Sequence, residues 1–325
     1  MTDRLSTDSH DINEDRLMNT TLSQSTSLRR KASPTVAGPA GWSRRALAGL
    51  AVTLLVLVLG YLAIRPWHLR WGATDAEVAA AMPGDLSGRR WTRAVTIDAS
   101  PEQIWPWLIQ WGQGRGGWYS YDWLENLFGF DIHSAEAILP EHQDLAVGDP
   151  ICMAAGVCVS TVVVIEPNRW LGWQSTDEAG RPVWSFTLGL NPIDPDHTRL
   201  IVRESFSPDA LPAAVLVAIE IPDAVMELKA LDTVKRRAEG TLPSLWLTVF
   251  EIVAWLAALL CGLLAGMLAI ARANWLPALA VGAAAVIVLL GLTFLFPPLW
   301  LRAALDLGLV AGLIWSGRKA SSIRG

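Results

Sequence analysis

The chain has 325 residues, of which 52% are hydrophobic and only 18% are charged, and its formal net charge is −5. Soluble domains carry roughly a quarter of charged residues, so this composition predicts long apolar segments that cross a membrane. The acidic balance argues against a nucleic-acid-binding protein, which would normally present a basic face.

The first 45 residues are expected to form a disordered tail, because they are rich in Ser, Thr and Asp and poor in large apolar residues. A charge-free run from Ala46 to Ile64 follows, and it is long enough to cross a bilayer. A polar tail precedes this run and no small-residue cleavage site follows it. We therefore interpret residues 46–64 as an uncleaved membrane anchor.

Residues 72–240 are expected to form one soluble α+β domain. Its first strand, Arg90–Ala99, leads into a helix from Pro101 to about Trp111, and a glycine-rich loop connects that helix to a second one, Tyr121–Phe128. Alternating apolar residues between turn signals then predict four strands, at Cys158–Glu166, Arg169–Ser175, Val183–Leu190 and Thr198–Ser207.

A final helix, about Pro222 to Glu239, presents one apolar face that would cover the sheet. The mostly apolar stretch before it, Leu211 to Ile221, has two interpretations. It is either a segment lying at the membrane interface or the early part of the same helix, and we favour the helix.

Two long motifs mark this domain, Val95-Thr-Ile-Asp-Ala-Ser-Pro-Glu-Gln-Ile-Trp-Pro-Trp-Leu and Gly112-Gln-Gly-Arg-Gly-Gly-Trp-Tyr-Ser-Tyr-Asp-Trp-Leu-Glu-Asn. Shorter ones follow, Asp131-Ile-His-Ser-Ala, Leu145-Ala-Val-Gly-Asp and Met226-Glu-Leu near Lys235-Arg-Arg-Ala-Glu. Together they resemble a bacterial branch of the SRPBCC superfamily, also called START-like, which includes the polyketide cyclase/dehydrase group.

The resemblance covers roughly residues 74–240 and implies a helix-grip fold. In that fold a curved antiparallel sheet wraps the long last helix and leaves a cavity between them. Members bind lipids, sterols, polyketides or other apolar molecules, and some catalyse reactions on them. The resemblance therefore implies the same class of ligand here, and it leaves open whether a reaction takes place.

Aromatic residues are the main candidates for the wall of a ligand pocket, because bulky rings suit an apolar ligand. Arg115 is a candidate for binding an anionic headgroup. The glycines from Gly112 to Gly117 formally fit a dinucleotide-binding pattern, but a helix rather than a strand precedes them, so we expect a tight helix–helix connection instead. The expected ligand-binding residues are Trp107, Trp111, Arg115, Trp118, Tyr119 and Trp184.

Candidates for general acid–base chemistry are His133, Asp122, Glu125, Glu204, Tyr119 and Tyr121. Glu204 shares strand parity with Leu200, Val202 and Phe206, so it is expected to point inward, where a carboxyl group would need a partner or have a raised pKa. The alternative for each candidate is an ordinary hydrogen bond at the domain surface. The acids and histidines between Asp131 and His142 match no metal signature, so neither a metal nor a cofactor is expected.

Cys152 and Cys158 flank a turn-like sequence between two strands. They form either a disulfide across a hairpin, which requires an oxidising compartment, or two small buried apolar positions.

The last third of the chain predicts three membrane helices within residues 244–316, at Leu245–Ile270, Trp275–Phe296 and Leu299–Trp315. With residues 46–64 they make about four spans. Arg302 and Asp306 in the last span lie one helical turn apart, so Arg302 can extend towards the membrane surface and can pair with Asp306. A basic tail, 317–325, ends the chain.

Lys and Arg residues cluster before the first span and after the last one, which favours a cytoplasmic location for both ends of the chain. The domain would then lie outside the cytoplasmic membrane of a bacterium. The leading functional hypothesis is a membrane-anchored domain that binds a lipid or another apolar small molecule in an internal cavity. The alternatives are a cyclase, dehydratase or hydrolase acting on such a molecule, and a ligand-free scaffold or sensor for a protein partner.

Overall fold

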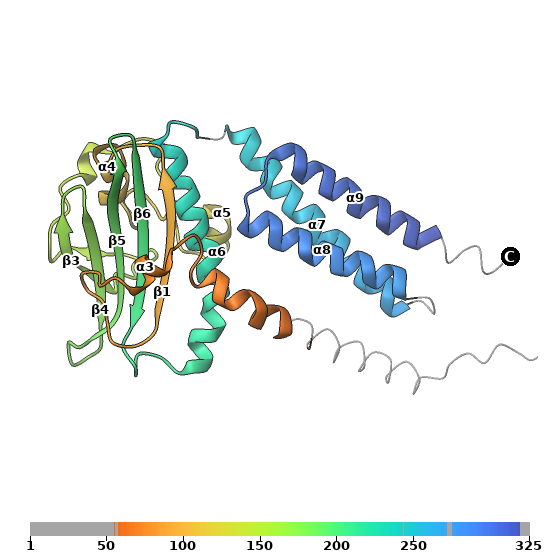
Figure 1. Ribbon diagram of the computed structural model, residues 1–325, viewed down its shortest axis with the longest axis horizontal. Coiled ribbons are helices and arrows are strands. Elements are labelled where there is room, and N and C mark those ends of the chain that lie inside the picture. Colours follow the sequence, from red (N-terminus) through yellow and green to blue (C-terminus); the bar gives the residue numbers. More distant parts are fainter. Residues whose placement is uncertain (1–54, 56–57, 243, 272–274, 319–325) are drawn as a thin grey trace, which may run out of the picture. The chain divides into compact units, whose positions relative to one another are not determined.

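The structure, a computed structural model, describes residues 55, 58–242, 244–271 and 275–318. The predicted tail and most of the predicted span 46–64 lie outside the described residues, as does most of the basic tail. Residues 58–68 form a helix, and the short α3, Asp75–Ala79, follows it. Figure 1 shows one sheet with helices packed beside it.

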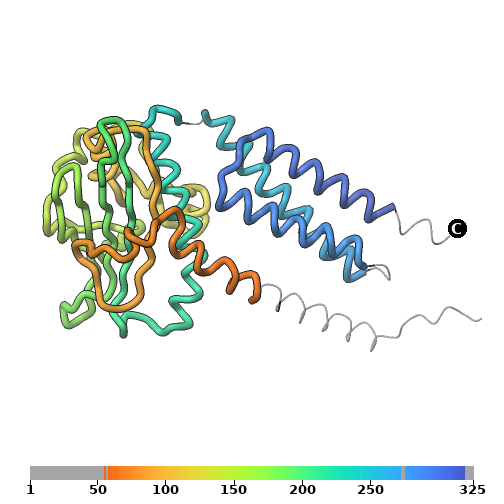
Figure 2. Tube along the Cα trace, viewed as in Figure 1, coloured from red at the N-terminus to blue at the C-terminus, as the bar shows by residue number. Residues whose placement is uncertain are grey.

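The sheet has six antiparallel strands in the order β1-β6-β5-β4-β3-β2. Their bounds are β1 Arg90–Ile97, β2 Pro150–Ile151, β3 Ser160–Glu166, β4 Trp170–Thr176, β5 Pro182–Asp194 and β6 His197–Phe206. Register shifts interrupt the pairing of β3 with β4, β4 with β5 and β5 with β6. Such bulges bend strands, which fits the curved sheet that the sequence predicts. The tight β5–β6 hairpin can be followed in Figure 2.

The helices of the domain follow the predicted order. They are α4 Pro101–Ile109, α5 Asp122–Leu127, the 3₁₀ turn η1 Pro140–His142 and α6 Ala213–Ala238. The helix α6 begins earlier than the predicted start at Pro222, and Pro222 lies inside it. Proline is most frequent in the first turn of a helix, and for that reason the helix was predicted to start at Pro222. The stretch 211–221 is therefore mostly the first part of α6, as we favoured.

One face of the sheet, here called the inner face, is covered by α4 and α6. Alternate residues of each strand form this face, because side chains alternate across a strand. The largest hydrophobic core lies here and includes Trp107, Trp111, Tyr119, Trp173 and Phe186. This arrangement of a curved antiparallel sheet and a long final helix is consistent with a helix-grip fold.

The opposite, outer face is covered by the segment that leads from the helix 58–68 to β1. Arg203 of β6 is buried there and contacts Asp85 at 2.9 Å, and Arg199 contacts Glu77 at 2.7 Å. These ion pairs hold the connecting segment against the outer face of β6.

Three described helices are long and apolar enough to cross a membrane, namely α7 Leu245–Ala271, α8 Leu276–Phe294 and α9 Leu299–Arg318. The structure thus supports three candidate spans and not the four predicted, since only residues 55 and 58–64 of the first predicted span are described. The expected pair of Arg302 with Asp306 is also wrong. Arg302 instead contacts Glu251 of α7 at 3.3 Å, because α7 and α9 pack together.

Candidate functional site

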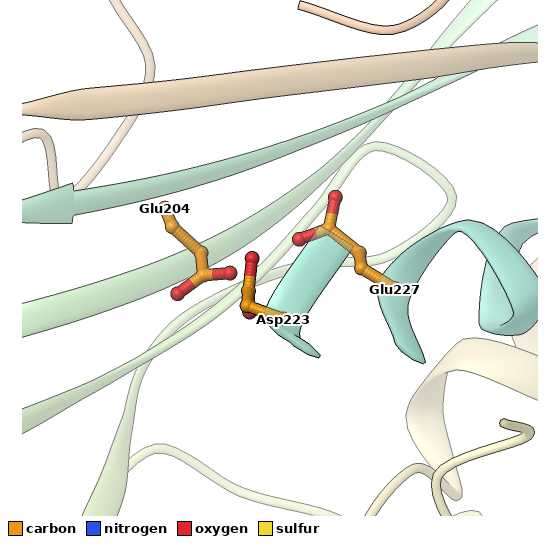
Figure 3. A group of neighbouring side chains, drawn as sticks. All are labelled: Glu204, Asp223 and Glu227. Carbon is orange, nitrogen blue, oxygen red and sulfur yellow. The ribbon is translucent and has the colours of Figure 1, made fainter. Parts of the chain in front are cut away.

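Three carboxyl groups meet between the sheet and α6. Glu204 extends from β6, and Asp223 and Glu227 extend from α6, as Figure 3 shows. One oxygen atom from each of the three lies within 4.8 Å of the others. Asp223 and Glu227 lie one helical turn apart, and Glu204 shares the inward parity of Val202 and Phe206. We call these three residues together with Arg93 the acid cluster.

Arg93 of β1 supplies the positive charge of the acid cluster. Its side chain is fully buried, and its Nη1 atom lies 2.7 Å from Glu227, 2.9 Å from Asp223 and 4.0 Å from Glu204. Its Nε atom donates a hydrogen bond of 3.0 Å to the carbonyl oxygen of His68. A single guanidinium group thus faces three carboxyl groups, and it also contacts the end of the helix 58–68.

Burial and charge together shift the acid–base behaviour of this cluster. Burial raises the pKa of Glu227 to about 7. The positive charge of Arg93 lowers this pKa, and the negative charge of Asp223 raises it further. Burial and the neighbouring carboxylates raise the pKa of Glu204 well above its usual range. Both shifts favour the protonated, uncharged form of these two carboxyl groups. The indole of Trp184 donates to the other side of Glu204 at 2.7 Å.

Three carboxylates at this spacing also resemble the oxygen ligands of a hard divalent cation. Arg93 argues against that use, because its guanidinium already binds Asp223 and Glu227 from within the cluster. A divalent cation would have to share those oxygens with a fixed positive charge. We therefore treat the acid cluster as an ion-paired network.

An aromatic wall adjoins the acid cluster on the same inner face. Phe186 of β5 pairs in register with Glu204, and Trp173 of β4 stacks on Phe186 with ring centroids 4.8 Å apart. Trp111 contacts Phe186, and Trp118 contacts Trp173, both edge to face. On the inner face, the charged side chains of the acid cluster are therefore directly followed by the aromatic side chains of the wall.

Several buried polar atoms on this face have no hydrogen-bond partner among the described residues. They are Nη2 of Arg93, Oε1 of Glu204 and Glu227, and the indole nitrogens of Trp111, Trp118 and Trp173. More than nine-tenths of buried polar groups in proteins are paired, so each exception calls for an explanation. Six of the ten such atoms among the described residues lie on this face, and the other four belong to His68, Arg115, Glu125 and Asp306.

Most candidates from the sequence do not converge with Glu204. His133 is exposed and contacts Asp131 at 3.0 Å. Asp122 accepts hydrogen bonds from the backbone and hydroxyl of Ser134. Tyr121 lies under the ammonium group of Lys229. The structure thus distributes these residues around α5 and the following loop, apart from the acid cluster.

Glu125 and Tyr119 are the buried members of that second group. Burial raises the pKa of Glu125 to about 7, and its Oε1 atom accepts a hydrogen bond of 2.7 Å from Ser120. Burial likewise raises the pKa of Tyr119 to about 12, and Gln110 donates to its hydroxyl at 2.8 Å. Both residues have partners that suit a structural role.

The glycine-rich loop closes tightly, as its composition predicts. Gly112 and Gly117 pair with each other, and both have a positive φ angle. A Cβ atom on Gly117 would lie 2.6 Å from Cα of Ser134, so only glycine fits. Arg115 braces this loop by donating to the carbonyl oxygens of Ile109 and His142. This side chain is engaged within the loop rather than at the acid cluster.

Two cavities are described, and neither is lined by the aromatic wall. One, of about 430 Å³, lies at the start of α6 and includes Arg89, Leu211 and Leu216. Leu216 packs on Trp91 and Phe206, which border the acid cluster in the sheet. The other, of about 420 Å³, is apolar and lies between the helix 58–68 and the candidate spans.

Cys152 and Cys158 form a disulfide across the short loop between β2 and β3. Cys261 in α7 is the free cysteine of the described part of the chain, and it is buried.

No family model matches the chain, and no curated protein matches it. Solved structures do show similarity. Protein MLL2253 from Mesorhizobium loti shares 18% identity over 48% of this chain and 100% of its own, with a TM-score of 0.29. The Aha1 dimer from Colwellia psychrerythraea shares 18% over 45% and 96%, with a TM-score of 0.29. The ZhuI aromatase/cyclase from Streptomyces sp. R1128 shares 14% over 46% and 93%, with a TM-score of 0.24.

These scores are too low to transfer any property. The function therefore has to be argued from this chain's own residues.

Sequence reasoning identified Glu204 and missed the rest of the acid cluster. In the sequence, Arg93 is one residue of an alternating strand and nothing local marks it. It reaches Glu204 only through the pairing of β1 with β6, which is a long-range contact. A usable signal was present in α6. Asp223 and Glu227 interrupt the apolar stripe formed by Ala224, Leu228 and Leu231, and acids in a buried stripe require a partner.

Proposed function

We propose that the domain of residues 72–240 binds an apolar small molecule, such as a lipid, against the inner face of its sheet. The flanking helices hold this domain at a membrane. The observation that carries the proposal is that the aromatic wall and the acid cluster each contain three buried polar atoms without a hydrogen-bond partner. A ligand with an apolar body and one polar end would satisfy both regions.

The acid cluster limits the chemistry of that polar end. Three carboxyl groups face one guanidinium, so the cluster has more hydrogen-bond acceptors than its own donors satisfy. A hydroxyl or amine end would donate to Glu204 or Glu227, whereas a carboxylate or phosphate end would be repelled. The preferred ligand is therefore an apolar alcohol or amine rather than a fatty acid.

The cavity at the start of α6 is the entrance that fits this account. Leu216 lines it and also packs on Trp91 and Phe206, next to the acid cluster. A ligand arriving there would reach the inner face by displacing a few side chains. Bound ligand would thus be shielded by α6, which covers the face.

The cellular arrangement is part of the same proposal. The candidate spans α7, α8 and α9 support attachment to a membrane. The disulfide between Cys152 and Cys158 supports a domain outside the cytoplasm, since disulfides persist in oxidising compartments. Both ends of the chain would then lie in the cytoplasm, as the distribution of Lys and Arg favours.

A second candidate function is catalysis on the bound molecule. The neighbouring carboxyls Glu204 and Glu227 favour it, because burial raises the pKa of Glu227 to about 7, a value suited to proton transfer. In that case Glu204→Gln would abolish turnover and leave binding of the molecule intact.

Binding can be tested with photoreactive probes on the full chain in lipid nanodiscs. Three probes of equal alkyl length would end in a hydroxyl, an amine or a carboxylate. We expect the hydroxyl and amine probes to crosslink peptides of β4, β5 and β6, and an excess of unlabelled alcohol to compete. Crosslinks confined to α7, α8 and α9, or crosslinks that resist competition, would reject the proposal.

Trp173→Phe and Trp170→Phe form a matched pair of variants for this test. Trp173 lies on the inner face, and Trp170, three residues earlier on the same strand, packs on the outer face. Each change keeps a ring and removes an indole N–H. Crosslinking should weaken in Trp173→Phe and stay unchanged in Trp170→Phe.

A further inference from the structure

The first part of α6 differs in chemistry from the rest of the helix. No charged residue lies between Asp209 and Glu220, while the later part carries Lys229, Asp232, Lys235 and Arg236. Leu211, Val215 and Val217 are 39%, 41% and 39% exposed. We call residues 211–221 the apolar segment. Val215 and Val217 project on opposite flanks of the helix, with the exposed Ala214 and Ala218 between them, so the exposed side of the segment is hydrocarbon, which soluble proteins seldom leave in water.

The other side of the apolar segment is fixed in place. Leu216 is buried against Trp91 and Phe206 of the sheet. Glu220, the single acid at its end, is fully buried and accepts hydrogen bonds of 2.6 and 2.7 Å from Arg65. Tyr61 also donates to Glu220. The exposed side of the segment therefore cannot turn inward without breaking these contacts.

The contact with Arg65 and Tyr61 shows what lies beside the segment. Both residues belong to the helix 58–68, which continues the charge-free run predicted to cross the bilayer. Tyr and Arg at the end of such a run are typical of the membrane–water boundary. Further along α6, Ala224 and Leu228 pack on Phe294, the last residue of the candidate span α8, so the segment lies near the end of a span.

We propose that the apolar segment lies on the lipid bilayer surface, with Val215 and Val217 at the boundary between headgroups and acyl chains. This goes beyond ligand binding and does not depend on it. The partner is a lipid surface, because the same helix packs on the end of the candidate span α8 and the exposed side of the segment carries no charge. Arg89, which lies 3.6 Å from Glu220 and is partly exposed, suits the anionic headgroup layer.

Depth measurements on the full chain in liposomes test this placement. In a Cys261→Ala background, Val215→Cys or Val217→Cys would carry an environment-sensitive fluorophore. Ile193→Cys, in the exposed β5–β6 hairpin, is the control. We expect a blue-shifted emission and several-fold stronger quenching by brominated lipids at 215 and 217 than at 193. Aqueous iodide should show the reverse order.

Two results would overturn the proposal. Labels at 215 and 217 that iodide quenches as strongly as the label at 193 would place the segment in water. Labels shielded from both iodide and brominated lipid would mean that protein covers the segment instead. A label at Leu211→Cys provides a second check. The double variant Val215→Asp/Val217→Asp should lower its quenching by lipid, while an unchanged near-ultraviolet circular dichroism spectrum shows that the fold is kept.

Discussion

Arg93 of β1 and Glu227 of α6 form a buried ion pair, with 2.7 Å between Nη1 and Oε2. The pair joins the first strand of the domain to its last helix. Removing one partner of a buried pair leaves an uncompensated charge, which costs more than the pair itself contributes.

Arg93→Met should therefore destabilise the domain strongly, by about 3–5 kcal/mol. Loss of the guanidinium leaves Glu204, Asp223 and Glu227 facing one another without a counter-charge. Chemical denaturation of the full chain in detergent, followed by tryptophan fluorescence, measures the change. Arg181→Met, which removes an exposed pair with Asp177, is the control and should leave the midpoint unchanged. Equal midpoints for the two variants would contradict this role of Arg93.

The pKa of Glu227 predicts how stability depends on pH. The pKa is raised to about 7 in the folded chain from an ordinary value of 4.5. Between these values the folded chain holds a proton that the unfolded chain has released. The stabilisation is therefore complete below about pH 4.5 and is lost as the pH rises towards 7, by at most about 1.4 kcal/mol per pH unit for one group.

Glu227→Gln cannot ionise, so its free energy of unfolding should fall less than that of the wild type over this range. Glu125 has a pKa raised to the same value by burial, at a separate place in the fold. Glu125→Gln should independently reduce the slope of the free energy of unfolding against pH. A slope that neither variant changes would show that both carboxyls titrate normally.

The glycine loop gives a prediction about packing. Gly114 and Gly117 both have a positive φ angle, but a Cβ atom would meet open space at Gly114 and the backbone of Ser134 at Gly117. Gly114→Ala should cost about 1–2 kcal/mol from backbone strain alone. Gly117→Ala should cost about 1–3 kcal/mol more, because Ser134 must move. Denaturation midpoints measure both, and similar values would contradict the tight closure.

The disulfide provides a test of orientation. In intact cells, a membrane-impermeant reductant followed by a membrane-impermeant maleimide should label Cys152 and Cys158. Cys152→Ser/Cys158→Ser is the control and should lose the label. If labelling requires lysis of the cells, the domain faces the cytoplasm and the proposed orientation is wrong.

Local patterns predicted the elements of this domain well and predicted their partners poorly. The alternation around Val202, Glu204 and Phe206 was enough to turn Glu204 inward, because strand parity is a local property. The partner Arg93 depends on the pairing of β1 with β6, which joins residues more than a hundred positions apart. The same limit explains Arg302. Its neighbour in sequence, Asp306, was the obvious partner, but helix packing brings Glu251 closer.

The apolar segment shows a second limit. The composition of this segment fitted both a helix and an interfacial segment. The two interpretations are compatible, because most of the segment is helical and part of its surface is exposed. Burial of Glu220 by Arg65 could not be anticipated from either residue alone.

Native mass spectrometry of the intact chain released from nanodiscs tests ligand binding most directly. If the domain holds one apolar molecule on its inner face, the spectrum should show the chain with a single added mass that corresponds to a neutral or amine lipid. Glu204→Leu should lose this added mass, and Trp170→Phe should retain it. A wild-type spectrum showing only the bare chain, from every lipid extract offered, would contradict the account.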